Sequence, residues 1–598
     1  MRNDRFPSGL VVSEMEMPGT GETRHMRFAM GSRRVIAAVA VLLAGCAMAL
    51  ALAPDSSPAV SKRPNVVLIM TDDQRFDELA AMPNTRRLLK TQGTTFSNSF
   101  VTFPLCCPSR TSFMSGQMAH NHGIGGNFNP TGFHGLTTEQ QRNLLPAWLQ
   151  KAGYRTSHVG KYLNGYGDDG VLTKPPGWSD WHGTVDQTSY DFLNTRIRDN
   201  NKTNQIGSKE WIGEVMRLSG VVSRQELTRF ANLDNLNDPT TLIGQILAMR
   251  AFNDAHGGTY GTTSRKKYLV DELSNRAVNF VRSTKGSSKP FYMQYAPPAP
   301  HREDVTEQVG YRGINPRVPP RYDNLVQGKS APRNSPSFDE ADISDKPDFF
   351  QSKFTSRLGD IPVNGTFGHP SLTMLDNYYR GRYGSLKAVD DGVKRIVDAL
   401  KNAGKLNNTM IIFTSDNGWM MGEHRIVGDK FVPYEESIRV PLIIRGPGIP
   451  KNKTVDALVA NTDLTSTVLQ ATKVNPSPGR VQDGTSLIPV AKTGESVREY
   501  VPIEATRDLF VLPGFPYEWD TPYYGVRTER YKYVKWVANA TKGRSEEEEL
   551  YDLLNDPYEL ENLIESSDPA IQQVLDELRA KAEELKECAG TSCFRSPG

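Results

Sequence analysis

Short apolar runs alternate with amphipathic segments over most of this chain. The first run, at residues 64–70, is continuous and rich in β-branched side chains, which is typical of a strand buried on both faces. Similar strands are predicted at residues 154–159, 290–296 and 409–414. Amphipathic helices are predicted at residues 144–152, 269–282 and 383–403. This alternation predicts an α/β fold in which a large mixed sheet is sandwiched by helices.

The pattern changes near residue 497. Residues 524–527, 531–536 and 549–553 are predicted as antiparallel strands, and residues 570–588 as a charged amphipathic helix. We interpret the glutamate run at residues 546–549 as a solvated turn. The chain is therefore expected to contain a large domain over residues 61–496. A smaller C-terminal α+β domain, an antiparallel sheet plus a helix, is expected over residues 497–598.

Two long segments, residues 186–263 and 302–373, are poor in strand signals and rich in Asn, Gly, Pro and charged residues. Long irregular segments in a compact domain are usually functional insertions. We expect both to shape the rim of a site.

Residues 1–60 are interpreted as an export signal with its leader and linker. Arg33-Arg34 precedes an apolar run at residues 35–53, as in the charged and apolar regions of a signal peptide. Three endings remain open: a lipobox that would lipidate Cys46, ordinary cleavage after Ala53, or an uncleaved membrane anchor. The protein is expected to be exported, and either secreted or anchored at the cell surface.

The composition is that of a globular protein, with 38% hydrophobic and 23% charged residues among 598. The net charge of +2 gives no indication of nucleic-acid binding. Five cysteines are too few for a disulfide scaffold. Cys588 and Cys593 are spaced to close a small disulfide loop, and the alternative is two free thiols.

Polar residues follow two of the predicted buried strands directly. Asp72 and Asp73 come after the first strand, and Asp416 and Asn417 follow the strand at residues 409–414. Open α/β sheets place ligands at such strand ends. Oxygen-only ligands suit a hard divalent cation, Ca²⁺ or Mg²⁺, better than zinc. The alternative for each motif is a simple turn.

Residues 106–116 carry the most specific motif, Cys-Cys-Pro-Ser-Arg followed after four residues by Ser-Gly. This string resembles the signature of the type I sulfatases, in the alkaline phosphatase superfamily. The resemblance extends over about residues 63–564. It implies that a maturation enzyme oxidises Cys106 to formylglycine, whose hydrate is the nucleophile and a metal ligand together with Asp72, Asp73, Asp416 and Asn417.

The same resemblance implies roles for five further residues. Arg110 would hold the hydrated nucleophile, and Lys161 and Lys430 would bind sulfate. His301 would bind sulfate and protonate the leaving oxygen, and His424 would act at the rim or in deprotonation. His120 and His122 are weaker candidates, and His158, inside a predicted strand, is interpreted as structural.

The segment Lys161-Tyr162-Leu163-Asn164 departs from many sulfatases, which have a His at the position of Leu163. With the doubled cysteine, it resembles the N-acetylglucosamine-6-sulfatase and heparan 6-O-sulfatase branch. The resemblance implies a sulfuric ester hydrolase acting on a sulfated sugar, glycosaminoglycan-like, or on an aryl sulfate. The alternatives are a phosphonate monoester or phosphodiester hydrolase on the same scaffold, and a non-catalytic binder of sulfated glycans.

Overall fold

The computed structural model describes most of the chain from residue 63 onward. The described residues are 63–186, 188–207, 267–303, 315–353, 358, 372–505, 522–538 and 543–596. The predicted export signal and Cys46 lie outside them. Among the described helices, none combines the length and the apolar character needed to cross a membrane.

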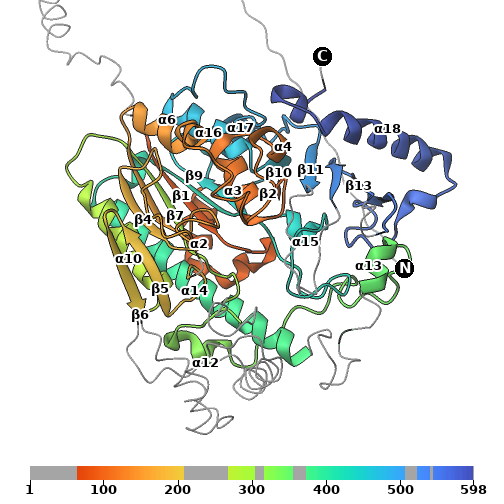
Figure 1. Cartoon of the computed structure of the whole chain (residues 1–598), viewed down its shortest axis with the longest axis horizontal. Helices are drawn as coiled ribbons and strands as arrows, with labels where there is room; N and C mark the ends of the chain where they lie inside the picture. Colours follow the sequence, from red (N-terminus) through yellow and green to blue (C-terminus); the bar gives the residue numbers. More distant parts are fainter. Residues whose placement is uncertain are drawn as a thin grey trace, which may run out of the picture. The chain divides into compact units, whose positions relative to one another are not determined.

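A mixed sheet of ten strands runs through the large domain, as predicted (Figure 1). Its strands in spatial order are β10 (Lys453–Ala460), β2 (Thr94–Phe100), β9 (Leu442–Arg445), β8 (Thr409–Ser415), β1 (Asn65–Thr71), β7 (Phe291–Ala296), β3 (Arg155–Gly160), β4 (Asp180–Thr184), β5 (Asn194–Asp199) and β6 (Lys202–Gly207). The central strand β1 pairs in parallel with both β7 and β8. The four strands with the clearest apolar runs, β1, β3, β7 and β8, lie where the sequence predicts them.

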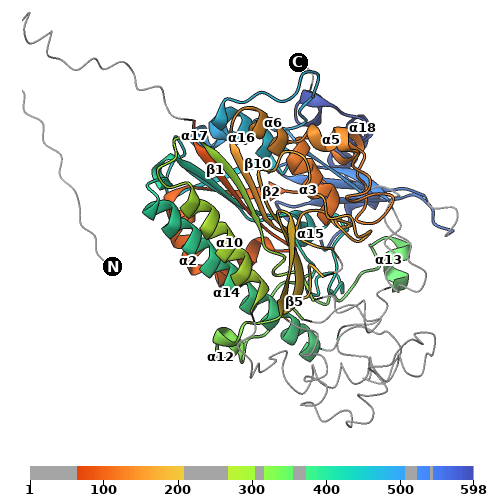
Figure 2. The same cartoon turned by 60° about the vertical axis from the view of Figure 1, so that its left-hand side comes forward.

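Helices cover both faces of this sheet (Figure 2). One face carries α2 (Pro83–Leu88), α10 (Leu269–Ser283) and α14 (Leu372–Asn402), and the other carries α3 (Cys106–Ser115), α6 (Leu145–Lys151), α16 (Asp463–Thr472) and α17 (Leu487–Thr493). Because strand side chains alternate, Val67 and Ile69 join the cluster under α10 and α14, and Val66 and Leu68 join the opposite cluster. The predicted helix-sheet-helix sandwich is confirmed.

The other α-helices that the structure describes before residue 440 are short segments in the connections. They are α4 (Ala119–His122), α5 (Thr138–Arg142), α12 (Asp323–Val326), α13 (Asp348–Lys353) and α15 (Glu435–Ile438).

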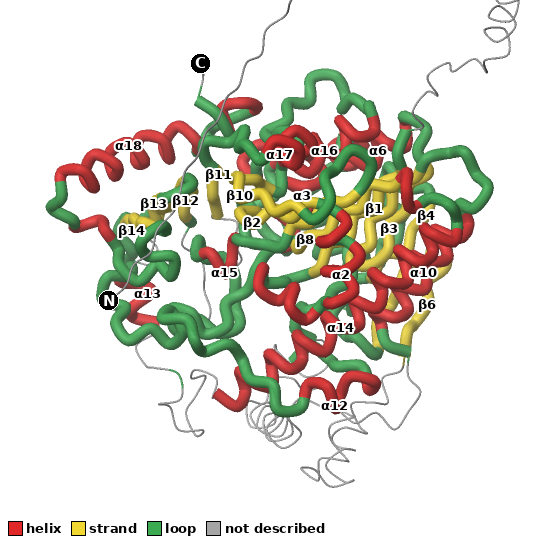
Figure 3. The backbone as a smooth tube through the Cα atoms, turned by 180° about the vertical axis from the view of Figure 1, so that it is seen from behind, coloured by secondary structure: helices red, strands yellow, loops and turns green. Residues whose placement is uncertain are grey.

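A second, antiparallel sheet follows in the C-terminal part of the chain (Figure 3). It contains β11 (Val501–Ala505), β12 (Tyr523–Arg527), β13 (Tyr531–Trp536) and β14 (Glu547–Asp552) in that order. The long helix α18 (Pro569–Leu585) packs on it, with Leu575 and Leu578 in one buried cluster with Val526 and Tyr533. The predicted α+β character is confirmed, whereas the boundary at residue 497 stays a prediction.

The structure corrects the interpretation of the glutamate run at residues 546–549. Most of the run lies in strand β14, and Glu549 is fully buried. Its carboxylate accepts hydrogen bonds from Tyr434 (2.9 Å), Trp536 (2.6 Å) and Tyr551 (2.6 Å). These donors satisfy a charge that would otherwise favour solvent.

The segment 186–263 is also not purely irregular. Residues 194–207 form the β5–β6 hairpin, which extends the large sheet at its edge. Asn200, in the turn between these strands, adopts a left-handed backbone conformation with φ 51°, which asparagine tolerates better than most residues. Residues 208–263 lie outside the described residues.

Candidate active site

The two predicted metal-binding motifs meet at one end of the large sheet. Strands β1 and β8 are parallel neighbours, and Thr71 pairs in register with Ser415. The next residues along both strands therefore lie side by side. Asp416 Oδ1 accepts a hydrogen bond from the Asp73 backbone nitrogen at 3.0 Å, and Asn417 Nδ2 donates to Asp73 Oδ1 at 2.7 Å.

Cys106 is the first residue of helix α3 and is buried beside this strand end. Its Sγ lies 3.7 Å from Asp72 Oδ1 and 3.1 Å from Lys430 Nζ. The amide groups at a helix N-terminus also bring partial positive charge to this position. Burial raises the pKa of the Cys106 thiol to about 11, although Lys161 and Lys430 act in the opposite direction.

Arg110 follows Cys106 by about one helical turn and joins two strand ends to helix α3. Its Nε donates to Asp416 Oδ2 at 2.8 Å, and its guanidinium also lies 3.4 Å from Asp72 Oδ2. Nη1 donates to the Lys161 carbonyl at 2.9 Å. Lys161 comes directly after β3, and its Nζ lies 2.7 Å from Asp72 Oδ2. The buried cations Arg110 and Lys161 therefore compensate the charges of the Asp72 and Asp416 carboxylates.

Asp73 has its own cationic partners. Lys430 Nζ contacts Asp73 Oδ1, and His301 Nε2 lies 3.5 Å from Asp73 Oδ2. Burial alone would raise the pKa of Asp73, but Lys430 and His301 more than offset it, so the pKa lies below its ordinary value. His301 Nδ1 is 2.8 Å from the Arg302 carbonyl, which can only accept. Nδ1 therefore carries a hydrogen, and Nε2 is the nitrogen that faces the strand end.

The residues at this strand end fit a divalent cation. Asp72 Oδ2, Asp73 Oδ2 and Asn417 Oδ1 are buried and accept no hydrogen bond, although Lys161 Nζ is close to Asp72 Oδ2 without hydrogen-bond geometry. One ligand atom each from Asp72, Asp73 and Cys106 lies within 4.8 Å of the others. Buried oxygens without donors are costly, and hard cations such as Ca²⁺ and Mg²⁺ bind such sets.

Family comparisons identify the class of protein that carries this site. Residues 64–474 match the family model described as Sulfatase, and residues 422–588 match N-sulphoglucosamine sulphohydrolase, C-terminal. This chain belongs to the sulfatase family. It is therefore a hydrolase of sulfate esters, and the resemblance carried by residues 106–116 is confirmed.

The N-acetylglucosamine-6-sulfatase of Homo sapiens is 30% identical to this sulfatase over 90% of this chain and 87% of the relative. Extracellular sulfatase homologues of Caenorhabditis elegans and Drosophila melanogaster are 29% and 31% identical, but this chain spans only 53% and 32% of their lengths. One solved structure is of a protein in complex with its substrate D-glucosamine-2-N,6-O-disulfate. It matches 88% of this chain and 98% of its own, with a TM-score of 0.60 and 23% identity, which shows the shared fold.

His424 lies outside the contacts that join the other site residues of this sulfatase. It is fully buried, its Nδ1 is 2.6 Å from Glu340 Oε2, and its ring packs against Tyr434 with centroids 4.3 Å apart. One ligand atom of His424 also lies within 4.8 Å of carboxylate oxygens of Glu436 and Glu559. The structure thus places His424 in a buried polar network between the Lys430 loop and the C-terminal part of the chain.

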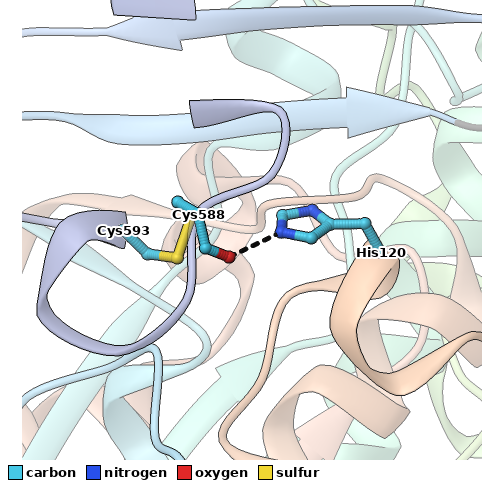
Figure 4. A group of neighbouring side chains, drawn as sticks. All are labelled: His120, Cys588 and Cys593. Atoms are coloured by element: carbon cyan, nitrogen blue, oxygen red, sulfur yellow. Dashed lines mark hydrogen bonds between the residues drawn. A yellow bond between two sulfur atoms is a disulfide. The ribbon is translucent and has the colours of Figure 1, made fainter. Parts of the chain in front are cut away.

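The weaker histidine candidates are also accounted for by local contacts. His120 Nδ1 lies 2.7 Å from Glu504 Oε2, and Figure 4 shows its Nε2 directed at the Cys588 carbonyl, 2.9 Å away. The same view shows the disulfide between Cys588 and Cys593, which the sequence spacing predicts correctly. The two sulfurs are therefore bonded to each other, and His120 pairs with the Cys588 carbonyl and not with a sulfur.

His122 and His158 are buried within the large domain. His122 Nε2 pairs with the Ser112 hydroxyl at 3.0 Å. His158 lies in β3 and stacks on Trp181 with ring centroids 4.7 Å apart, in agreement with its interpretation as structural.

Sequence reasoning missed one aromatic residue of the site, Tyr190. It follows β4 in the segment interpreted as an irregular insertion, yet its ring stacks on His301. No local motif marks this tyrosine, because its contacts come from residues far away in the sequence.

Proposed function

We propose that this sulfatase removes sulfate from the 6-position of N-acetylglucosamine or a related sugar of a glycosaminoglycan-like substrate. We further propose that formylglycine, made from Cys106 by a maturation enzyme, is its nucleophile and that one Ca²⁺ is its cofactor. The observation that carries the proposal is the buried group of three cations, Arg110, Lys161 and Lys430, which contact Asp72, Asp73 and the Cys106 side chain. The sugar specificity is supported by the names of the relatives at about 30% identity.

The chemistry of Cys106 supports conversion of the thiol. A thiol whose pKa is raised to about 11 is almost wholly protonated at neutral pH and is a poor nucleophile. A hydrated aldehyde at the same position offers two hydroxyl groups instead. Lys430 Nζ, 3.1 Å from the sulfur, would lie close to these hydroxyls and favour their ionised form.

One hydroxyl of the hydrate, in its ionised form, attacks sulfur, a new S–O bond forms, and the bond from sulfur to the sugar oxygen breaks. His301 Nε2 donates its proton to the departing sugar oxygen as a general acid. The second hydroxyl then passes its proton to the neutral His301, the C–O bond to sulfate breaks, sulfate leaves, and the aldehyde forms again. Water adds to the aldehyde and restores the hydrate.

Lys161 and Lys430 compensate the charge of the sulfate oxygens, and Arg110 orients the hydrate from helix α3. Asp72, Asp73, Asp416 and Asn417 would hold the cation together with an oxygen of the modified residue 106. A bound Ca²⁺ would supply charge stabilisation to the transferring group and the nucleophile. We assign His424 to holding the Lys430 loop, through Glu340 and Tyr434.

We also propose that the protein is exported, on the basis of the apolar run at residues 35–53 and its preceding arginines. The extracellular names of two relatives support this proposal. Export would also suit the disulfide between Cys588 and Cys593, since such bonds persist in oxidising compartments.

The test combines peptide mass spectrometry with a substrate comparison. Protein made in its own host should carry an aldehyde at residue 106, about 18 Da lighter than cysteine, since CHO replaces CH₂SH. It should hydrolyse N-acetylglucosamine 6-sulfate and 4-nitrophenyl sulfate faster than bis(4-nitrophenyl) phosphate or a phenylphosphonate. Cys106→Ala should abolish turnover of both sulfate esters.

Faster turnover of the phosphodiester or the phosphonate would instead favour a phosphoester hydrolase. Binding of sulfated glycan without turnover, unchanged in Cys106→Ala, would favour a non-catalytic binder. Activity in protein that carries only the thiol would overturn the nucleophile.

A further inference from the structure

One buried aromatic ring contacts three groups around the proposed reaction centre. The rings of Tyr190 and His301 are stacked, with centroids 3.9 Å apart and planes inclined by 18°. Lys161 Nζ lies 4.9 Å from the centre of the Tyr190 ring. The Tyr190 hydroxyl accepts a hydrogen bond from Asn164 Nδ2 at 3.0 Å. Tyr190 is only 6% exposed, so its ring is enclosed by the protein.

We propose that Tyr190 is the positioning residue of the general acid His301, and that Asn164 fixes Tyr190 in this role. The inference rests on the proposed function, because it assigns His301 to protonation of the leaving oxygen. The ring of Tyr190 also lies beside Lys161, two residues before Leu163. Leu163 is buried in an apolar cluster and offers no polar atom.

The stacking completes the orientation of the His301 ring. The hydrogen bond from Nδ1 to the Arg302 carbonyl holds one edge of the ring but does not by itself set the tilt of the ring. The stacked Tyr190 ring, whose centroid lies 3.9 Å from that of His301, restricts this tilt and keeps Nε2 directed at the strand end, 3.5 Å from Asp73 Oδ2.

Asn164 connects this tyrosine to the helix that carries the nucleophile. Its backbone nitrogen donates to Cys107 Sγ at 3.0 Å, and its Oδ1 lies 3.5 Å from the same sulfur. Cys107 is the neighbour of Cys106 in helix α3. The contact chain from Cys107 through Asn164 and Tyr190 to His301 therefore fixes the acid relative to the nucleophile.

A positioning role for a general acid predicts a dependence on the leaving group. A sugar alcohol is a poor leaving group and needs a proton as the ester bond breaks, whereas 4-nitrophenolate departs without one. Loss of Tyr190 should therefore slow the sugar sulfate much more than the aryl sulfate. General damage to the fold would slow both substrates by the same factor.

The experiment compares Tyr190→Leu and Tyr190→Phe with the parent enzyme, at equal formylglycine content measured by mass spectrometry. The substrates are N-acetylglucosamine 6-sulfate and a series of aryl sulfates whose phenols differ in acidity. Tyr190→Leu should lower kcat for the sugar sulfate at least about tenfold more than for 4-nitrophenyl sulfate, and rates should depend more steeply on phenol acidity. Tyr190→Phe keeps the stacked ring but loses the hydrogen bond from Asn164, so it should show the same selectivity more weakly, with a loss on the sugar sulfate of no more than about threefold.

Tyr154→Leu is the matched control, since it removes another buried tyrosine ring, whose hydroxyl bonds to Pro64 at the opposite end of β3 from Lys161. It should show no selectivity between the substrates. If Tyr190→Leu lowers the yield of folded protein, Tyr190→Met, whose unbranched side chain adapts more easily to the space, takes its place. Equal losses on both substrates would overturn the inference, and so would a Phe variant as selective as Leu. A parent enzyme without sulfate ester hydrolysis would instead refute the proposed function.

Discussion

Replacement of Lys532 by methionine tests the link between the C-terminal sheet and the active-site loop. Lys532 lies in β13 and is fully buried. Its Nζ contacts Glu559 Oε1, donates to the Pro433 carbonyl at 2.7 Å and lies 3.8 Å from Glu435 Oε1. Pro433 is three residues beyond Lys430, so this ammonium group holds the chain beside a proposed sulfate-binding lysine.

The expected loss of stability follows from what Lys532→Met leaves behind. Glu435 retains Arg527, 3.0 Å away, but Glu559 loses its contacting cation while it remains buried. Breaking a buried ion pair from one side costs about 3–5 kcal/mol, and the lost hydrogen bond to Pro433 adds about 1 kcal/mol. Burial already raises the pKa of Glu559, so protonation should reduce the penalty as the pH falls towards 5.

Differential scanning calorimetry at pH 5 and pH 8, together with kcat on 4-nitrophenyl sulfate, measures both effects. Lys535→Met is the matched control, because this lysine lies in the same strand but pairs at 3.1 Å with the exposed Glu546. Exposed ion pairs contribute about 0–1 kcal/mol to the free energy of unfolding, so the unfolding temperature of Lys535→Met should stay close to that of the parent. The double variant Lys532→Met/Glu559→Gln should recover at least about 1 kcal/mol relative to additivity. Equal stability of Lys532→Met and Lys535→Met would refute the reasoning.

Two further perturbations test the metal site and the C-terminal loop. Dialysis against a chelator should abolish sulfate ester hydrolysis and lower the unfolding temperature, because Asp72, Asp73 and Asn417 each keep a buried oxygen that accepts no hydrogen bond. Ca²⁺ at 100 times its dissociation constant should restore about 2.7 kcal/mol of the free energy of unfolding. An unfolding temperature that neither treatment changes would contradict the metal site. Burial alone would lower the pKa of His120, but Glu504 more than offsets it and raises the pKa to about 9. Since the folded-state pKa exceeds the unfolded value of about 6.5, this pair should stabilise the protein fully below pH 6.5 and lose its effect as the pH rises through 9. Thermal unfolding of the parent and of His120→Gln between pH 6 and pH 10 checks this, and parallel curves would contradict it.

The buried strands could be predicted because their apolar runs reflect burial on both faces, which is a local property of the sequence. Strands next to the two ends of the sheet, such as β2 and β5, carry polar residues on a partly exposed face, so no continuous apolar run marks them. Helix α14 begins at Leu372, earlier than the predicted residue 383, and Arg382, directly before the predicted start, is buried against Glu78 at 2.7 Å. A buried arginine does not follow an amphipathic pattern, which assumes charges in solvent.

The candidate site divides in the same way. Asp72 and Asp416 follow buried strands, so their convergence could be expected from the order of elements alone. Glu549 and Tyr190 could not be placed, because their burial depends on partners such as Trp536 and His301 that only the tertiary structure brings near. The local sequence therefore predicts which polar residues lie at strand ends, but it does not predict which polar residues pack against partners far away in the sequence.

The burial of Cys106 has a consequence for the timing of its maturation. The groups that enclose it come late in synthesis: Asp416 is 306 residues beyond Arg110, and Lys430 is 324 residues beyond Cys106. At about 5–20 residues per second, the ribosome needs about 15–60 s to reach them after residue 106 has been made. Throughout that interval residue 106 cannot be enclosed as it is in the folded protein. Under the proposed function, a thiol that escapes oxidation before the chain closes over it stays a thiol, and the fraction of active enzyme is decided during synthesis.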